Sequence, residues 1–382
     1  MAAAGARQAA RLAGTLALAL AAALGCAALH TPIPWMLGPL LAVTLASLAG
    51  APTAASVLLR ALAQAVLGVS LGLYFTPPVL QLLATLGGAI AAAVAWALLI
   101  GTLFGAWLRR RQAGAFPGLS PAAMRCTSYY AGAVGAASEM TLQAERVGAR
   151  ADLVAAAHGL RMLIVVVVIP FAMLATRSLW GESAAAAVGG LPPLRPVGAA
   201  GLALLALAAA GGALAARALR LTNPWFLGPL AVAIALAATE RAPSGVPTAL
   251  SNAAQLLIGV SLGVRFSPGF LRVAPGWMAH VALGTLAMIL ASALFGAGLG
   301  ALCGVPLATA VLGTAPGGMA EMAITAKVLQ LGVPLVTAFQ VSRMVAVLVL
   351  VQPLYRLLYG RGPVGGTPDD EAAPPSSGLP PR

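Results

Sequence analysis

Charged residues are scarce in this chain of 382 residues: Asp, Glu, Lys and Arg together account for 8% of it, against roughly 25% in an ordinary soluble domain. Hydrophobic residues account for 60%, which excludes a protein folded mainly in contact with water. Several apolar runs reach the roughly 20 residues that a helix needs to cross a bilayer core. The runs are continuous rather than alternating, which favours helices over a β-barrel. The sequence therefore predicts an all-α polytopic membrane protein.

Cysteine and histidine are also rare, with three of each. Cys26, Cys126 and Cys303 fall in different apolar segments without a CxxC spacing, so they predict neither a disulfide framework nor a metal cluster. A copper or iron oxidase needs convergent ligands that three scattered histidines do not supply. We therefore expect no metal, no cofactor and no enzymatic activity.

The net charge of +13 is spread singly along the loops, and "RRR" at 109–111 is the one tight run. Such a distribution is not that of a nucleic-acid-binding surface, but it is typical of loops that face the cytoplasm. We expect a multi-pass protein of the bacterial cytoplasmic (inner) membrane with both termini in the cytoplasm. The expected partners are the lipid bilayer and an unidentified small molecule, without nucleic acid, and a homo-oligomer is left open.

Four sequence segments occur twice in the same order, which indicates an internal duplication. Two pairs match in most of their letters, "PWMLGPL" (34–40) with "PWFLGPL" (224–230) and "AQAVLGVSLGLYFTPPVL" (63–80) with "AQLLIGVSLGVRFSPGFL" (254–271). Two further pairs share fewer letters but include the same Glu-Met and Arg-Met dipeptides, "SEMTLQAE" (138–145) with "AEMAITAK" (320–327) and "LRMLIVVVV" (160–168) with "SRMVAVLVL" (342–350). A duplicated membrane protein is most often a transporter with its site where the repeats meet.

The apolar runs predict about ten transmembrane helices, five in each repeat. They cover 9–29, 33–49, 56–74, 80–108 and 151–175, then 197–219, 224–239, 250–266, 276–302 and 334–358. The resulting organisation is a first membrane repeat over 1–175, a loop over 176–196, a second repeat over 197–360 and a disordered tail over 361–382.

One segment of each repeat is interrupted. In the second repeat, residues 305–332 give about nine helical residues, a break at "APGG" and about a dozen more. Each arm is too short to span alone, so the segment is either re-entrant or a broken crossing helix. The re-entrant alternative inverts the second repeat and places more loop arginines inside the cell, which favours inverted repeats.

Glu139 and Glu321 occupy matching positions just after these interruptions, near Gly132 and Gly135 in one repeat and Pro316, Gly317 and Gly318 in the other. A carboxylate in an apolar segment is costly and suggests function. Beside a helix break it could bind a cation or carry a proton. The alternative is that each Glu caps the first turn of the following half-helix.

Two polar residues on the fifth helix of each repeat occupy matching positions. Arg161 and Arg343 could bind an anion, neutralise the two glutamates or reach toward the membrane surface. His158 and Gln340 each lie three residues earlier, on the same helix face. His158 could relay protons, but Gln at the matching position makes a hydrogen-bonding role an equal alternative.

The repeated "GVSLG" contains a G-x-x-x-G spacing, for which close helix packing is the default interpretation. Ser70 and Ser261 within it, together with the nearby Gln64 and Gln255, are candidates for lining a cavity.

The duplicated "PWxLGPL", the "GVSLG" repeats and "APGGMAEMAITAK" followed by "QVSRM" resemble the AbrB family of bacterial membrane proteins. The resemblance covers about residues 10–358, although "YYAGAVGAASEM" lacks the proline of the second break. Members of that family are labelled ammonia monooxygenases or regulators of gene expression. The residues fit neither an oxidoreductase nor a direct DNA-binding regulator.

The function predicted from the residues is secondary transport of a small substrate, coupled to protons through Glu139 and Glu321. The alternative is a membrane sensor or regulatory protein that influences gene expression without transport.

Overall fold

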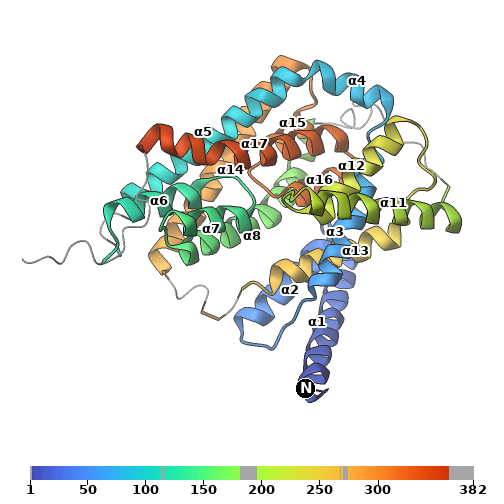
Figure 1. The fold of residues 1–382 in the computed structure, drawn as a ribbon, viewed down its shortest axis with the longest axis horizontal. Helices are drawn as coiled ribbons and strands as arrows, with labels where there is room; N and C mark the ends of the chain where they lie inside the picture. The colour runs from blue at the N-terminus through green and yellow to red at the C-terminus, as the bar shows by residue number, and fades with distance from the viewer. Residues whose placement is uncertain are drawn as a thin grey trace, which may run out of the picture.

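The computed structural model describes residues 2–112, 115–116, 118–180, 196–266, 268–269 and 274–360, and all regular structure in them is helical (Figure 1). The first half contains α1 (Ala2–Ala28), α2 (Pro34–Leu48), α3 (Val57–Gly72), α4 (Pro77–Thr85), α5 (Gly87–Arg111), α6 (Pro121–Gly132), α7 (Ala137–Arg146), α8 (Ala151–Ala175) and α9 (Arg177–Trp180). The second half contains α11 (Ala199–Ala218), α12 (Pro224–Ala238), α13 (Thr248–Gly263), α14 (Pro275–Cys303), α15 (Leu307–Thr314), α16 (Met319–Val328) and α17 (Val333–Tyr359).

The helix lengths agree with a polytopic membrane protein. Among the described residues, six helices are long and apolar enough to cross a membrane, namely α1, α5, α8, α11, α14 and α17. A seventh span results if α3 and α4 are taken together, although they meet at a bend of 84°. The other predicted spans, α2, α12 and α13, have only 15 or 16 residues and so fall short of a core about 30 Å thick.

One predicted helix is wrong in its course. The run over 80–108 is not a single helix, because α4 ends at Thr85 and α5 begins at Gly87. The glycine pair at 87 and 88 follows this joint, and glycine lowers the cost of leaving helical geometry. Pro77 starts α4 at a position where the missing N–H is tolerated.

The helices form two groups, and each group contains helices from both halves of the chain. In the first helix group (α1–α3 and α11–α13), α2 packs against α13 and α3 against α12. In the second helix group (α5–α8 and α14–α17), α5 packs against α17 and α8 against α14. Contacts of α3 with α16 and α17 join the groups, and α16 lies near the middle of Figure 1.

The two "GVSLG" segments make close helix contacts between the halves. A Cβ added at Gly68 of α3 would lie 2.5 Å from the carbonyl oxygen of Phe226 in α12, and one at Gly259 of α13 would lie 2.6 Å from that of Met36 in α2. No real side chain tolerates such distances. The packing interpretation of these motifs is confirmed, and each "GVSLG" lies on the "PWxLGPL" helix of the other half.

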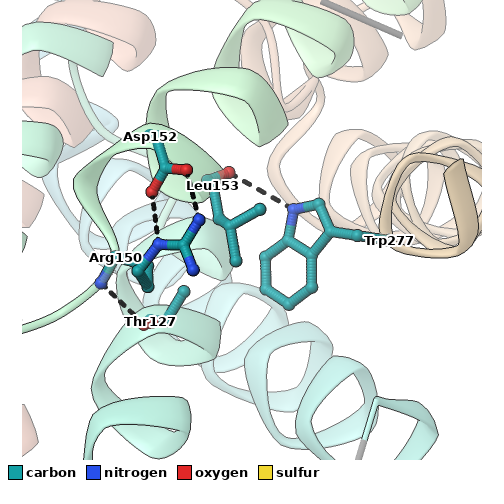
Figure 2. Close-up of polar contacts among 5 residues, drawn as sticks. All are labelled: Thr127, Arg150, Asp152, Leu153 and Trp277. Carbon is teal, nitrogen blue, oxygen red and sulfur yellow. Dashed lines mark hydrogen bonds and ion pairs between the residues drawn. The ribbon is translucent and has the colours of Figure 1, made fainter. Parts of the chain in front are cut away.

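The start of α8 is fixed by a small polar cluster (Figure 2). The backbone N–H of Arg150 donates to Oγ1 of Thr127 in α6 at 3.0 Å, and Nε1 of Trp277 in α14 donates to the carbonyl of Leu153 at 3.3 Å. The Arg150 guanidinium makes a two-pronged ion pair with Asp152, with N–O distances of 2.8 and 2.6 Å. These contacts set the position of α8, which carries His158 and Arg161.

Two of the predicted segments fall largely outside the described residues. The predicted loop over 176–196 begins with the short helix α9, but its residues 181–195 are not described, and neither is the tail over 361–382. The inversion of the repeats stays a prediction.

Candidate functional site

A cavity of about 240 Å³ lies between the two helix groups and contains most of the polar residues selected from the sequence. The first group contributes α3, α13 and the residues preceding α12. The second contributes α8, α17 and the two interruptions, at residues 134–139 and 316–321. Both interruptions therefore reach one cavity, although they are far apart in the sequence.

Each interruption joins two half-helices. In the first half, α6 ends at Gly132 and α7 begins at Ala137, and in the second, α15 ends at Thr314 and α16 begins at Met319. The carboxyl end of one half-helix carries unpaired carbonyls and a partial negative charge, and the amino end of the next carries free N–H groups and a partial positive charge. Such ends require polar partners.

Arg161 and Arg343 serve the carboxyl ends. Arg161 donates through Nη1 to the carbonyls of Ala131 and Gly132 at 3.3 and 3.5 Å, and Arg343 donates to those of Ala315 and Gly317. Both side chains are only 5% exposed. The guanidinium groups therefore compensate the partial negative charge at the ends of α6 and α15.

This arrangement differs from the expected pairing of these arginines with the glutamates. In the described part of the chain, Arg150–Asp152 is the one ion pair within 4.0 Å. Arg161 and Arg343 bind carbonyls at the half-helix ends and not carboxylates. A carbonyl without a hydrogen-bond donor in an apolar interior is itself costly.

His158 and Gln340 support the same ends. Nε2 of His158 lies 3.0 Å from the carbonyl of Tyr130, and Nε2 of Gln340 donates to the carbonyls of Leu312, Gly313 and Ala315 at 2.9 to 3.2 Å. His158 lines the cavity, whereas Gln340 lies outside its lining. Both are buried, so their local role is to hold α6 and α15 against the fifth helix of each repeat.

Glu139 and Glu321 both lie in the first turn of the following half-helix and both line the cavity. Their exposure differs, since Glu321 is 6% exposed and Glu139 is half-buried. The Glu321 carboxylate folds back over Gly318, where a Cβ would overlap its Oε2 atom. The position matching Gly318 is Ala136, so a Cβ is present in the first half where the second half has none.

The remaining sequence-selected residues divide between the cavity and its surroundings. Gly135, Pro316, Gly317 and Gly318 line it, and so do Gln64 and Ser261. Four others lie outside the lining: Gly132, which packs on α5, Gln340, Gln255, which is buried, and Ser70. Ser70 instead accepts a hydrogen bond of 2.5 Å from Nζ of Lys327.

Three basic residues with polar surroundings were not selected from the sequence. Arg60 and Arg265 line the cavity, and Lys327 donates to Ser251 at 3.1 Å as well as to Ser70. A signal existed for Arg60, which lies four residues before Gln64 and so on the same face of α3. Arg265 is the second residue after the second "GVSLG".

No group of three or more His, Cys, Asp or Glu side chains that could hold a metal ion occurs among the described residues.

Comparison with known proteins identifies relatives along most of the chain. The family model described as "Transition state regulatory protein AbrB" matches residues 35–359. The chain is 30% identical to the "Uncharacterized protein YhjN" of Bacillus subtilis (strain 168), over 78% of each chain. It is 27% identical to the "Putative regulator AbrB" of Escherichia coli (strain K12), over 89% of this chain and 94% of the relative. No solved structure matches significantly. The chain thus belongs to the AbrB family, as its repeated motifs indicated.

Proposed function

We propose that this protein is a secondary transporter, not an enzyme, that moves a small substrate across the bacterial inner membrane. The observation that supports this function best is that both helix interruptions line one cavity between two helix groups. Irregular backbone at membrane depth is tolerated where it lines a cavity, and interrupted helices form the binding sites of many secondary transporters. A shift of one helix group against the other would change the side from which the cavity is reached.

The proposal includes proton coupling through the two glutamates. A carboxylate at the start of a half-helix can take up a proton when the cavity faces one side of the membrane and release it when the cavity faces the other. Glu321 is buried and Glu139 is half-buried, so the two should contribute unequally. We assign the larger part to Glu321.

Transport is tested with the full-length protein in proteoliposomes, by recording pH-driven charge movement for a panel of carboxylates, inorganic phosphate, amino acids, ammonium and amines. Glu321→Gln should abolish the pH-driven signal, and Glu139→Gln should reduce it. Glu240→Gln is the matched control, because Glu240 is exposed and lies outside the cavity. An unchanged pH-driven signal in both Glu321→Gln and Glu139→Gln would contradict proton coupling through these residues.

A membrane sensor or regulatory protein is the second candidate. It is favoured by the names of the family model and of the Escherichia coli relative, both of which describe regulation. A sensor binds its ligand without moving it. Saturable binding to the purified protein with no uptake in proteoliposomes would support the sensor and contradict transport.

The proposed orientation places both termini in the cytoplasm. A reporter that is active only in the cytoplasm should work when fused to either end of the chain. Activity at one end alone would contradict it.

A further inference from the structure

The charges around the cavity are unbalanced. Four arginines line it, namely Arg60, Arg161, Arg265 and Arg343, against the two glutamates Glu139 and Glu321. With His158 neutral, the formal charge of the lining is positive by two. Arg60 is half-buried and Arg265 is exposed, so both can be reached by a ligand, and an anion in the cavity would balance the excess positive charge.

The four arginines are not equivalent. Arg161 and Arg343 use their N–H groups on backbone carbonyls of the half-helix ends. Within the described part of the chain, Arg60 and Arg265 make hydrogen bonds through their backbone N–H groups, but their guanidinium groups have neither a hydrogen bond nor an ion pair. These two guanidinium groups therefore keep their donors available to a ligand.

Arg60 and Arg265 also act on each other. They come from different halves of the chain, Arg60 from α3 and Arg265 from the residues just after α13. They lie close enough to repel one another, while Glu321 attracts Arg265. Two like charges facing one cavity are stabilised by an anion between them.

The matching positions in the other half are not cationic. Ser251 matches Arg60 and Tyr74 matches Arg265. The two free cations thus gather in one cavity instead of being divided between two equivalent sites. Ser251 is instead occupied with Lys327, outside the cavity.

The backbone adds further donors of hydrogen bonds at the starts of α7 and α16, where the Glu321 carboxylate already accepts from its own N–H. The residues that precede α7 and α16 are Ala136 and Gly318, whose side chains cannot cap a helix. Both half-helices have ten residues, and their first turns border the cavity. Helix amino ends and arginine forks are the groups that proteins use to bind carboxylates and phosphates.

We propose that the substrate of this cavity is a small oxyanion, a carboxylate or a phosphate, held between Arg60 and Arg265. That the oxyanion is transported rests on the proposed function. The oxyanion site itself is tested by binding alone. Gln64 and Ser261 lie beside these cations in the lining and supply neutral polar contacts. The planar guanidinium favours two-pronged contact with either oxyanion.

Thermal unfolding of the full-length protein in detergent tests the site, with acetate, succinate, inorganic phosphate and sulfate as oxyanions and ammonium, methylamine and magnesium as cations. At least one oxyanion should raise the Tm in a saturable manner, and the cations should not. Comparing succinate with phosphate separates the two sources of the oxyanion. Arg60→Gln and Arg265→Gln should each weaken binding roughly 10- to 100-fold, as expected for loss of a hydrogen bond to a charged group.

Arg217→Gln is the matched control, because Arg217 is exposed on α11 and lies outside the cavity. Arg60→Lys and Arg265→Lys keep the charge and should bind with intermediate affinity, which separates charge from folding defects. Stabilisation by no oxyanion, or by a cation alone, would overturn the inference, as would equal binding by the two Gln variants and the control.

The outcomes also separate this inference from the transport proposal. Oxyanion binding that depends on Arg60 and Arg265 but produces no uptake would retain the site and refute transport. Uptake of a cation without any oxyanion binding would retain transport and refute the site.

Discussion

Nη2 of Arg161 donates a hydrogen bond of 2.7 Å to Nδ1 of His158. Because a guanidinium has only donors, Nδ1 must accept and carries no proton. The proton of the neutral ring then resides on Nε2, which donates to the carbonyl of Tyr130 at 3.0 Å. Both ring nitrogens are occupied, which favours the hydrogen-bonding interpretation of His158 over a proton relay.

His158→Gln should therefore be tolerated, because an amide can accept from Arg161 and donate to Tyr130 at once, and Gln340 already plays the donor part in the other half. His158→Leu leaves a buried carbonyl and part of a guanidinium without partners. We expect it to lower the free energy of unfolding by about 1–3 kcal/mol. Thermal unfolding of both variants in one detergent measures the difference. Equal melting of the two would contradict this role.

Gly318→Ala should displace the carboxylate of Glu321, because the added Cβ would overlap Oε2. We expect the variant to lose pH-driven uptake while keeping its elution volume in gel filtration. Ala136→Gly is the matched change in the other half and should leave uptake nearly intact. Loss of uptake in Ala136→Gly alone would show that Glu139, and not Glu321, makes the larger contribution to proton coupling.

Gly68→Ala should destabilise the protein, since its Cβ would meet the Phe226 carbonyl of α12. Overpacking of this kind costs about 1–3 kcal/mol. Gly211→Ala in α11 is the control, because a Cβ there has no atom within 4 Å and helix propensity favours alanine by up to about 1 kcal/mol. The melting temperature should fall in the first variant and hold or rise in the second. A stable Gly68→Ala protein would contradict the close approach of α3 and α12.

Lys327→Met should loosen α16. The lysine joins α16 to α3 through Ser70 and to α13 through Ser251, and methionine keeps most of the length without the donors. Hydrogen–deuterium exchange over residues 319–328 should become faster than in the unchanged protein. The exchange of α14 serves as an internal reference, because α14 packs mainly on α5, α8 and α15 and not on the helices that carry these serines. Unaltered exchange in α16 would mean that packing alone holds it.

Most helix positions could be predicted from the sequence because apolar runs and glycine breaks are local signals. The interrupted segments and the matching glutamates were found in this way. The joint between α4 and α5 was missed because both sides are apolar, and a hydropathy pattern does not record a change of direction. The partner of each "GVSLG" was not predicted either, since it depends on contacts between distant helices.

The site was only partly predictable for the same reason. Glu321 and Arg343 are recognisable as charges in apolar runs, and each has a matching charged residue in the first half. Arg60 and Arg265 have no charged counterpart in the other half, so the repetition of the sequence does not mark them as site residues. Their convergence depends on the packing of α3 and α13 against the second helix group.

The crossed packing of "GVSLG" on "PWxLGPL" has an evolutionary consequence. Each half supplies the surface on which the other half's glycines lie, so neither half contains a complete first helix group. A half-length ancestor of this architecture would have had to pair with a second copy of itself. Fusion of two copies into one chain would then have allowed the halves to diverge, so that Arg60 and Arg265 now have uncharged residues at their matching positions.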